Sequence, residues 1–293
     1  MRPDLAILIS AVLWGTVWIP VRQLNDAGWG QGLAISISGI VALAVLLPVL
    51  ILQRRYSQLV GSRVWIMGLV FAFGMALYLE SISRGNVARM VLLFYLMPVW
   101  GAIFGRILNG DPITVRRIVG IALGLAGLAV IFYDGTGIPL PSGTADYMAL
   151  FSGVVWAFAF AYSDVSKGLK STFGQVFTTL VLVGPIIYVL SLVPGSRETI
   201  AVSGLSNGTL AGQAWLVGLA VIWLLPGITL TLYGAGRMLP SRAAIFMMIE
   251  VAVALVSAAL LIDEPFGLRE SIGAALIIGA SFGEFSGKPK QND

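Results

Sequence analysis

The chain consists largely of apolar runs of about 20 residues, the length that an α-helix needs to cross the roughly 30 Å hydrocarbon core of a bilayer. Lipid offers no hydrogen-bond partners, so the backbone of each run has to be helical. We expect ten transmembrane helices, at residues 4–22, 31–52, 64–83, 87–108, 114–133, 145–166, 173–193, 212–235, 241–262 and 268–285. The pattern therefore predicts an all-α integral membrane protein.

The composition excludes most alternatives to this class. With 58% hydrophobic and 11% charged residues, the chain has too little polar surface to cover a soluble globule. It contains no Cys and no His, which removes disulfides, thiolate metal sites and the usual general base. We therefore expect no catalytic residues, no metal and no cofactor. The net charge of +4 is spread over short loops, which indicates membrane topology rather than a nucleic-acid partner.

The sequence also repeats itself. A shift of 153 positions aligns Arg84 with Arg237, Arg89 with Arg242, Asp111 with Glu264, Pro112 with Pro265, Arg116 with Arg269 and Gly120 with Gly273. In so hydrophobic a chain apolar residues align by chance, but sparse Arg, Pro and acidic residues rarely do. The spacing indicates an internal duplication, with five predicted helices in each half.

The distribution of Lys and Arg predicts the orientation in the membrane. With the N-terminus in the cytoplasm, 13 of the 18 Lys and Arg residues lie on the cytoplasmic side, and both termini are cytoplasmic. Because each half has an odd number of helices, the second half enters from the opposite side, and the repeats are inverted. Inverted repeats are a common plan of secondary transporters, with the substrate path between the halves. We expect a first repeat at 1–134, a linker at 135–144, a second repeat at 145–287 and a cytoplasmic tail at 288–293.

Several motifs resemble those of a known family. They are a Trp-Gly pair in the first helix answered by a Trp in the sixth, an acid-proline pair after the fourth and ninth helices, and an Arg-x-x-x-Gly that opens the last helix of each half. In this chain they are Trp14-Gly15 and Trp156, Asp111-Pro112 and Glu264-Pro265, and the segments that begin at Arg116 and Arg269. With them the chain resembles, over nearly its whole length, two EamA domains of the drug/metabolite transporter superfamily. Within that superfamily it looks most like the YddG-type aromatic amino acid exporters. The resemblance implies a transporter of the bacterial inner membrane.

Aromatic residues inside the predicted helices indicate a binding site. Trp14 and Trp18, and likewise Trp156 and Phe160, are spaced i,i+4 and so share one helix face. If the two faces meet between the halves, they line a central cavity whose flat apolar walls suit aromatic or large neutral side chains and, by cation–π contact, an ammonium group. The alternative is that these rings pack against other helices or lipid. The candidate substrate-binding residues are Trp14, Trp18, Tyr78, Phe94, Tyr95, Trp100, Trp156, Phe160 and Glu250.

Glu250 lies in the middle of a predicted helix, where a carboxylate is costly and ionisable groups usually serve a function. It either binds a substrate amine or a proton, or is a structural residue hydrogen-bonded to a neighbouring helix. The family pattern has Pro after this Glu, but here Val251 follows, whereas the first half has Met97-Pro98. Glu80 precedes Arg84 by four residues, which predicts a local ion pair.

Three classes of function follow from these features. A secondary transporter that exports small organic solutes by alternating access, with aromatic or large neutral amino acids as the preferred substrates, is favoured by the inverted halves, the short loops and the aromatic interior. A multidrug or other metabolite exporter is the alternative within that class. An intramembrane lipid-modifying enzyme would need a His/Asp cluster, a metal site or a Ser with a base, and a scaffold role is supported only by the lack of a soluble domain. The expected partners are a small-molecule substrate and membrane lipid. A single copy of the chain can build the predicted architecture, and the sequence leaves the oligomeric state open.

Overall fold

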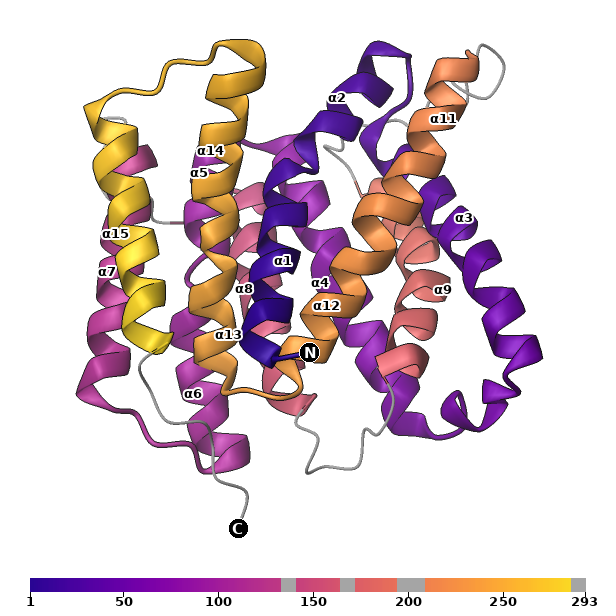
Figure 1. The fold of residues 1–293 in the computed structure, drawn as a ribbon, viewed down its shortest axis with the longest axis horizontal. Helices are drawn as coiled ribbons and strands as arrows, with labels where there is room; N and C mark the ends of the chain where they lie inside the picture. The colour runs from indigo at the N-terminus through magenta and orange to yellow at the C-terminus, as the bar shows by residue number, and fades with distance from the viewer. Residues whose placement is uncertain (133–140, 164–171, 194–208, 286–293) are drawn as a thin grey trace.

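The computed structural model describes residues 1–132, 141–163, 172–193 and 209–285, and its regular elements within these ranges are all helices. The elements are α1 (Pro3–Thr16), α2 (Trp18–Asp26), α3 (Gln31–Leu52), the 3₁₀-helix η1 (Arg55–Gln58), α4 (Ser62–Arg84), α5 (Val87–Phe94), α6 (Met97–Asn109), α7 (Val115–Phe132), α8 (Thr144–Tyr162), α9 (Thr172–Ser191), α11 (Leu210–Gly218), the π-helix η3 (Leu219–Leu224), α12 (Leu225–Ala235), α13 (Pro240–Met247), α14 (Ile249–Ile262) and α15 (Leu268–Phe285). Figure 1 shows them as one bundle of long helices.

Nine helical segments of the described residues are long and apolar enough to cross a membrane, so the chain is an integral membrane protein. Four of the nine are interrupted helices, formed by α1 with α2, α5 with α6, α11 with η3 and α12, and α13 with α14. A further long helix, α15, coincides with the tenth predicted run and carries Arg269, Glu270 and Glu284. The predicted tail and most of the predicted linker lie outside the described residues.

The first helix of each half packs into the other half. Helix α1 contacts α12, α13 and α14, whereas α8 contacts α4, α5 and α6. The loops after the interrupted helices lie at opposite ends of the molecule, that between α14 and α15 at the top of Figure 1 and that between α6 and α7 at the bottom. The end that carries α2 is called the α2 end below, and the end that carries Pro3 is called the Pro3 end.

Individual contacts repeat in the two halves. A shift of 142 positions aligns Ser10 of α1 with Ser152 of α8, and the shift of 153 aligns Gly74 of α4 with Gly227 of α12. The Ser10 hydroxyl donates a hydrogen bond to the Gly227 carbonyl over 3.1 Å, and the Ser152 hydroxyl donates to the Gly74 carbonyl over 2.8 Å. The two halves therefore hold their first helices by the same contact, exchanged between them.

Both mid-membrane helix breaks fall at equivalent positions, although only one of them has a proline. Helix α5 ends at Phe94, because Pro98 has no N–H to bond the Phe94 carbonyl. The second half has Val251 at the corresponding place, yet α13 ends at Met247, the repeat counterpart of Phe94. There the Val251 amide bonds the Met248 carbonyl instead, over 3.1 Å. The different residues after Met97 and Glu250 thus leave the same break in the two halves.

A third irregularity is the π-helix η3, which joins α11 to α12. Pro226, just after η3, cannot bond the carbonyl four residues before it, and such a defect is accommodated by a local widening of the helix. Leu219 and Leu224, the first and last residues of η3, line the cavity described below. The widened segment therefore forms part of its wall.

Candidate functional site

A cavity of about 290 Å³ lies between the two halves, in the interior of the helix bundle. It receives residues from α1, α2, α3, α4, α5, α8, η3 and α14, which means that both halves build it. The lining residues are Trp14, Val17, Trp18, Val21, Gln31, Ile35, Met75, Tyr78, Leu79, Ile82, Phe94, Trp156, Leu219, Leu224 and Glu250. Val21 lies in α2, Gln31 begins α3 and Ile82 lies near the end of α4, so the cavity extends from the middle of the bundle towards the α2 end.

Two equivalent tryptophans, Trp14 of α1 and Trp156 of α8, each lie against a glycine of the other half. A methyl group added to Gly227 would come within 3.3 Å of the Trp14 ring, and one added to Gly74 within 2.2 Å of the Trp156 ring. Trp156 also stacks on Phe71, with ring centroids 4.6 Å apart. The two glycines thus create the space in which flat rings form walls of the cavity.

Hydrogen bonds fix the orientation of two of the indoles. The Trp14 Nε1–H donates to the Thr231 hydroxyl over 3.1 Å, and the Trp18 Nε1–H donates to the Ser257 hydroxyl over 3.0 Å. Both acceptors belong to the second half of the chain, while both indoles belong to the first. Side chains held in this way keep their rings in place without a ligand, which lowers the cost of ordering them on binding.

The remaining aromatic walls come from Tyr78 and Phe94. Their ring centroids lie 4.3 Å apart, and Phe94 meets Trp156 edge to face at 5.6 Å. Tyr78, Phe94 and Trp156 therefore form one continuous aromatic surface, to which both halves of the chain contribute. Such a surface offers both ring faces and ring edges to a planar guest.

Glu250 supplies the charged group of this cavity. It lies in the first turn of α14, directly after the helix break, where the positive end of a helix dipole favours a carboxylate. The lining contains no Lys and no Arg, so Glu250 has no cationic side chain beside it within the cavity wall. An amine on a bound molecule is the complementary group for this position. Among the described residues no group of His, Cys, Asp and Glu could hold a metal ion.

Six of the nine predicted site residues line the cavity: Trp14, Trp18, Tyr78, Phe94, Trp156 and Glu250. The structure places the other three outside its wall. Tyr95 is fully buried behind Phe94, Phe160 is buried beside Trp156, and Trp100 packs on the core from α6. The shared helix face predicted for Trp156 and Phe160 thus brings only Trp156 into the cavity.

The aliphatic residues of the cavity wall were not among the predicted site residues. Met75, Leu79 and Ile82 line the cavity beside Tyr78 on α4. Their spacing of three and four residues places them on the helix face of Tyr78, so the periodicity of that segment contained the signal. In a helix that is apolar all round, however, nothing local distinguishes the face towards a cavity from the face towards lipid.

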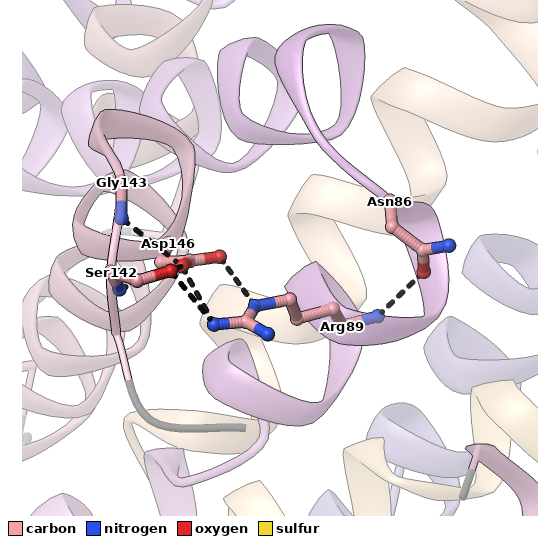
Figure 2. A network of polar contacts seen from close by, with 5 residues as sticks. All are labelled: Asn86, Arg89, Ser142, Gly143 and Asp146. Atoms are coloured by element: carbon pink, nitrogen blue, oxygen red, sulfur yellow. Dashed lines mark hydrogen bonds and ion pairs between the residues drawn. The ribbon is translucent and has the colours of Figure 1, made fainter. Parts of the chain in front are cut away.

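An ion pair at the α2 end ties α5 to α8, as Figure 2 shows. The Arg89 guanidinium donates to both carboxylate oxygens of Asp146, over 2.8 and 3.0 Å, and the Asn86 side chain accepts from the Arg89 amide at the start of α5. Asp146 also accepts from the Ser142 and Gly143 amides, which caps the start of α8. The network holds the first helix of the second half against the first half.

The Pro3 end carries the repeat counterpart of this ion pair. Arg242, the equivalent of Arg89, lies 3.1 Å from Asp4, which the shift of 142 positions aligns with Asp146. It holds α1 against α13. The predicted pair of Glu80 and Arg84 is also present, at 2.7 Å, and Arg84 donates in addition to the Leu190 carbonyl at the end of α9. These arginines are engaged with the protein itself.

Comparisons with known proteins agree with this architecture. The EamA-like transporter family matches residues 1–133. A protein of Archaeoglobus fulgidus, named as an uncharacterized transporter, is 26% identical over 94% of this chain and 93% of its own length. The uncharacterized transporter YvbV of Bacillus subtilis is 24% identical over 94% of this chain and 89% of its own length. A crystal structure of a protein that is 14% identical shares the fold over 96% of both chains, with a TM-score of 0.72.

The relatives are named as transporters, which is consistent with the expectation that this chain is not an enzyme. The chain is therefore an integral membrane protein whose first 133 residues are similar to the EamA-like transporter family and which is similar, over nearly its whole length, to proteins named as uncharacterized transporters.

Proposed function

We propose that the protein is a secondary transporter of a bacterial inner membrane, which exports small organic solutes by alternating access through the cavity between its halves. The preferred substrates are aromatic or large neutral amino acids, as for a YddG-type exporter. The observation that carries the proposal is the cavity itself, which both halves build and which combines five aromatic residues with Glu250.

The shape and chemistry of the cavity support the substrate class. A volume of about 290 Å³ accommodates a single ring system with a short side chain, and is small for most drug-sized molecules. Flat walls from Trp14, Trp18 and Trp156 favour a planar or large apolar side chain over a small one. The carboxyl group of Glu250 complements an amino group, which aromatic and large neutral amino acids carry.

A second candidate within the same class is an exporter of organic cations or other metabolites. The observation in its favour is that Glu250 is the only charged residue of the lining, with no Lys or Arg to bind a substrate carboxylate. An aromatic amine satisfies this site as fully as an amino acid does. The number of negative groups on the substrate therefore distinguishes the two candidates.

The arrangement of the helices supports an inverted repeat and a ten-helix topology. The serine contacts are exchanged between the halves and the two ion pairs lie at opposite ends of the molecule, as a twofold axis in the membrane plane requires. With α15 as the tenth helix, both termini lie on one side. The charge distribution assigns that side to the cytoplasm, which makes the α2 end external.

The test is counterflow in proteoliposomes that contain the purified protein. Vesicles loaded with unlabelled tryptophan should take up labelled tryptophan, phenylalanine and leucine, whereas vesicles loaded with glycine should not. Tryptamine and tryptophan amide, which lack the carboxylate, are compared with tryptophan as competitors. Competition by tryptophan alone favours the amino acid exporter, and stronger competition by the two amines favours the second candidate. Counterflow of none of these solutes would refute both.

A further inference from the structure

The described lining residues extend the cavity from the middle of the bundle towards the α2 end. The repeat assigns most of them a counterpart on the side of the Pro3 end. The part of the cavity towards the α2 end is lined by seven residues of the segments α1, α2 and α4: Val17, Trp18, Val21, Met75, Tyr78, Leu79 and Ile82. The shifts of 142 and 153 positions assign each of them a counterpart on α8 or α12, or just after α8. The counterparts are Ala159, Phe160, Ser163, Ile228, Thr231, Leu232 and Ala235.

All seven counterparts are completely packed. Each of them is at most 1% exposed, whereas every one of the seven lining residues except Met75 is partly exposed. Ser163 and Ala235 occupy the positions that correspond to Val21 and Ile82, the outermost of the seven. A methyl group added to Gly236, next to Ala235, would lie 2.9 Å from the Ser163 carbonyl, so the backbones of the two segments touch at this point.

Three other lining residues also have counterparts away from the cavity. Phe94, Leu224 and Glu250 line it, whereas their counterparts Met247, Phe71 and Met97 are buried and do not line it. In an inverted repeat, equivalent contacts hold equivalent helices in the two halves. Helices that separate at the α2 end therefore have counterparts that can separate in the same way at the Pro3 end. The buried counterparts therefore correspond to a closed path at the Pro3 end, and the lining residues to an open one at the α2 end.

We infer that the cytoplasmic half of the transport path runs between α8 and α12, from Phe160 and Thr231 in the middle to Ser163 and Ala235 at the Pro3 end. This inference rests on the proposed function, and it adds the residues that meet the solute on the side that is closed in this structure. The path is lined by smaller side chains than its external half, since Ser163, Thr231 and Ala235 replace Val21, Tyr78 and Ile82. The solute is thus held by rings on the external side and passes a wider, ring-poor route on the cytoplasmic side.

Cysteine accessibility tests this assignment, and the chain has no native cysteine to remove. The variants Ser163→Cys and Ala235→Cys each replace one small side chain by another. Ala149→Cys is the reference for a site that stays buried, because Ala149 is fully buried on the same helix α8, near its start at the α2 end, and its counterpart Ile7 does not line the cavity. Ser57→Cys, at an exposed position of η1, marks the Pro3 end. A membrane-impermeant maleimide is added from the Pro3 side of proteoliposomes in which counterflow is measured in parallel.

We expect Ser163→Cys and Ala235→Cys to react faster than Ala149→Cys and about 10- to 1000-fold slower than Ser57→Cys, because a minor conformation is typically populated at 0.1–10%. Saturating substrate should change their labelling in the direction opposite to that of Val21→Cys labelled from the α2 side. If both variants react no faster than Ala149→Cys while counterflow proceeds, the path assignment is wrong and the transporter remains. If counterflow is absent for every solute, the proposed function fails, and the labelling rates still decide whether this end opens.

Discussion

The hydroxyl of Tyr95 donates a hydrogen bond to the backbone carbonyl of Met247, 3.2 Å away in the other half of the chain. Tyr95 follows the last residue of α5, and Met247 is the last residue of α13, so one side chain joins the two mid-membrane helix breaks. The ring of Tyr95 lies behind Phe94 of the cavity wall, and the two ring centroids are 5.0 Å apart. Tyr95 therefore connects the breaks to the candidate binding site without lining it.

The first prediction concerns this connection. Tyr95→Phe removes the hydroxyl but keeps the ring, and it leaves the Met247 carbonyl without its donor. We expect the free energy of unfolding to fall by about 0.5 to 2 kcal/mol, the range for hydrogen bonds inside membrane proteins. Thermal unfolding in detergent measures the change. Tyr188→Phe on the exposed face of α9 is the control, and equal stability of the two variants would contradict the role of this hydroxyl.

The second prediction concerns the aromatic wall. Trp14→Ala should weaken the binding of tryptophan more than that of leucine, because a lost aromatic contact costs about 0.5 to 1.5 kcal/mol, or roughly 2- to 12-fold in affinity, beyond the area that is exposed. Binding is measured by calorimetry with both ligands. Trp65→Ala, at a position that is 41% exposed on α4, should leave both affinities unchanged. Equal losses for tryptophan and leucine at normal protein levels would show that Trp14 does not select the substrate.

The third prediction uses the two glycines that accommodate the tryptophans. Gly74→Ala brings a methyl group within 2.2 Å of the Trp156 ring, whereas the approach to Trp14 in Gly227→Ala is 3.3 Å. We expect Gly74→Ala to displace Trp156 and reduce affinity for aromatic ligands, and Gly227→Ala to be tolerated, since Ala favours a helix over Gly by up to about 1 kcal/mol. Comparison of tryptophan fluorescence and ligand affinity in the two variants is the measurement. A larger effect of Gly227→Ala would contradict the packing described.

The fourth prediction separates the two interpretations of Glu250. If its carboxylate binds an ammonium group, Glu250→Gln should weaken tryptamine about 10- to 100-fold, the equivalent of a charge-assisted hydrogen bond of 1.5 to 3 kcal/mol. Indole, which lacks the amine, should bind as before. Glu264→Gln, at an exposed position after α14, is the matched control. Equal weakening of tryptamine and indole would indicate that Glu250 is a structural residue.

The fifth prediction concerns topology. Reporter fusions at Asp293 and at Arg54 should report the cytoplasm, and a fusion at Gly28, between α2 and α3, should report the opposite side. The reason is the excess of Lys and Arg on the side that carries the termini. If the fusions at Asp293 and Gly28 report the same side, the ten-helix arrangement is wrong.

The class of the protein and most of its helices could be predicted from the sequence. Within the residues that the structure describes, every predicted apolar run is helical, four of them with an interruption, because the length and hydrophobicity of a run are local properties that the bilayer converts into a helix. The repeat was also visible, since Arg84, Arg89 and their partners in the second half stand out in an apolar chain. Six of the nine candidate residues line the cavity, because aromatic rings and a carboxylate deep inside apolar runs are uncommon enough to mark it.

Which faces of the helices meet could not be predicted from the sequence and depends on how the two halves pack. Phe160 is one turn from Trp156 and yet lies outside the cavity, while Met75 and Leu79, which carry no distinctive chemistry, line it. The helix break after Met247 could not be predicted from the sequence either. No proline follows it at the position of Pro98, and the Met247 carbonyl accepts a hydrogen bond from Tyr95 of the other half instead. The physical reason is the same in each case: in lipid an apolar face is satisfied equally by lipid, by another helix or by a cavity, and only the packing of the two halves selects among them.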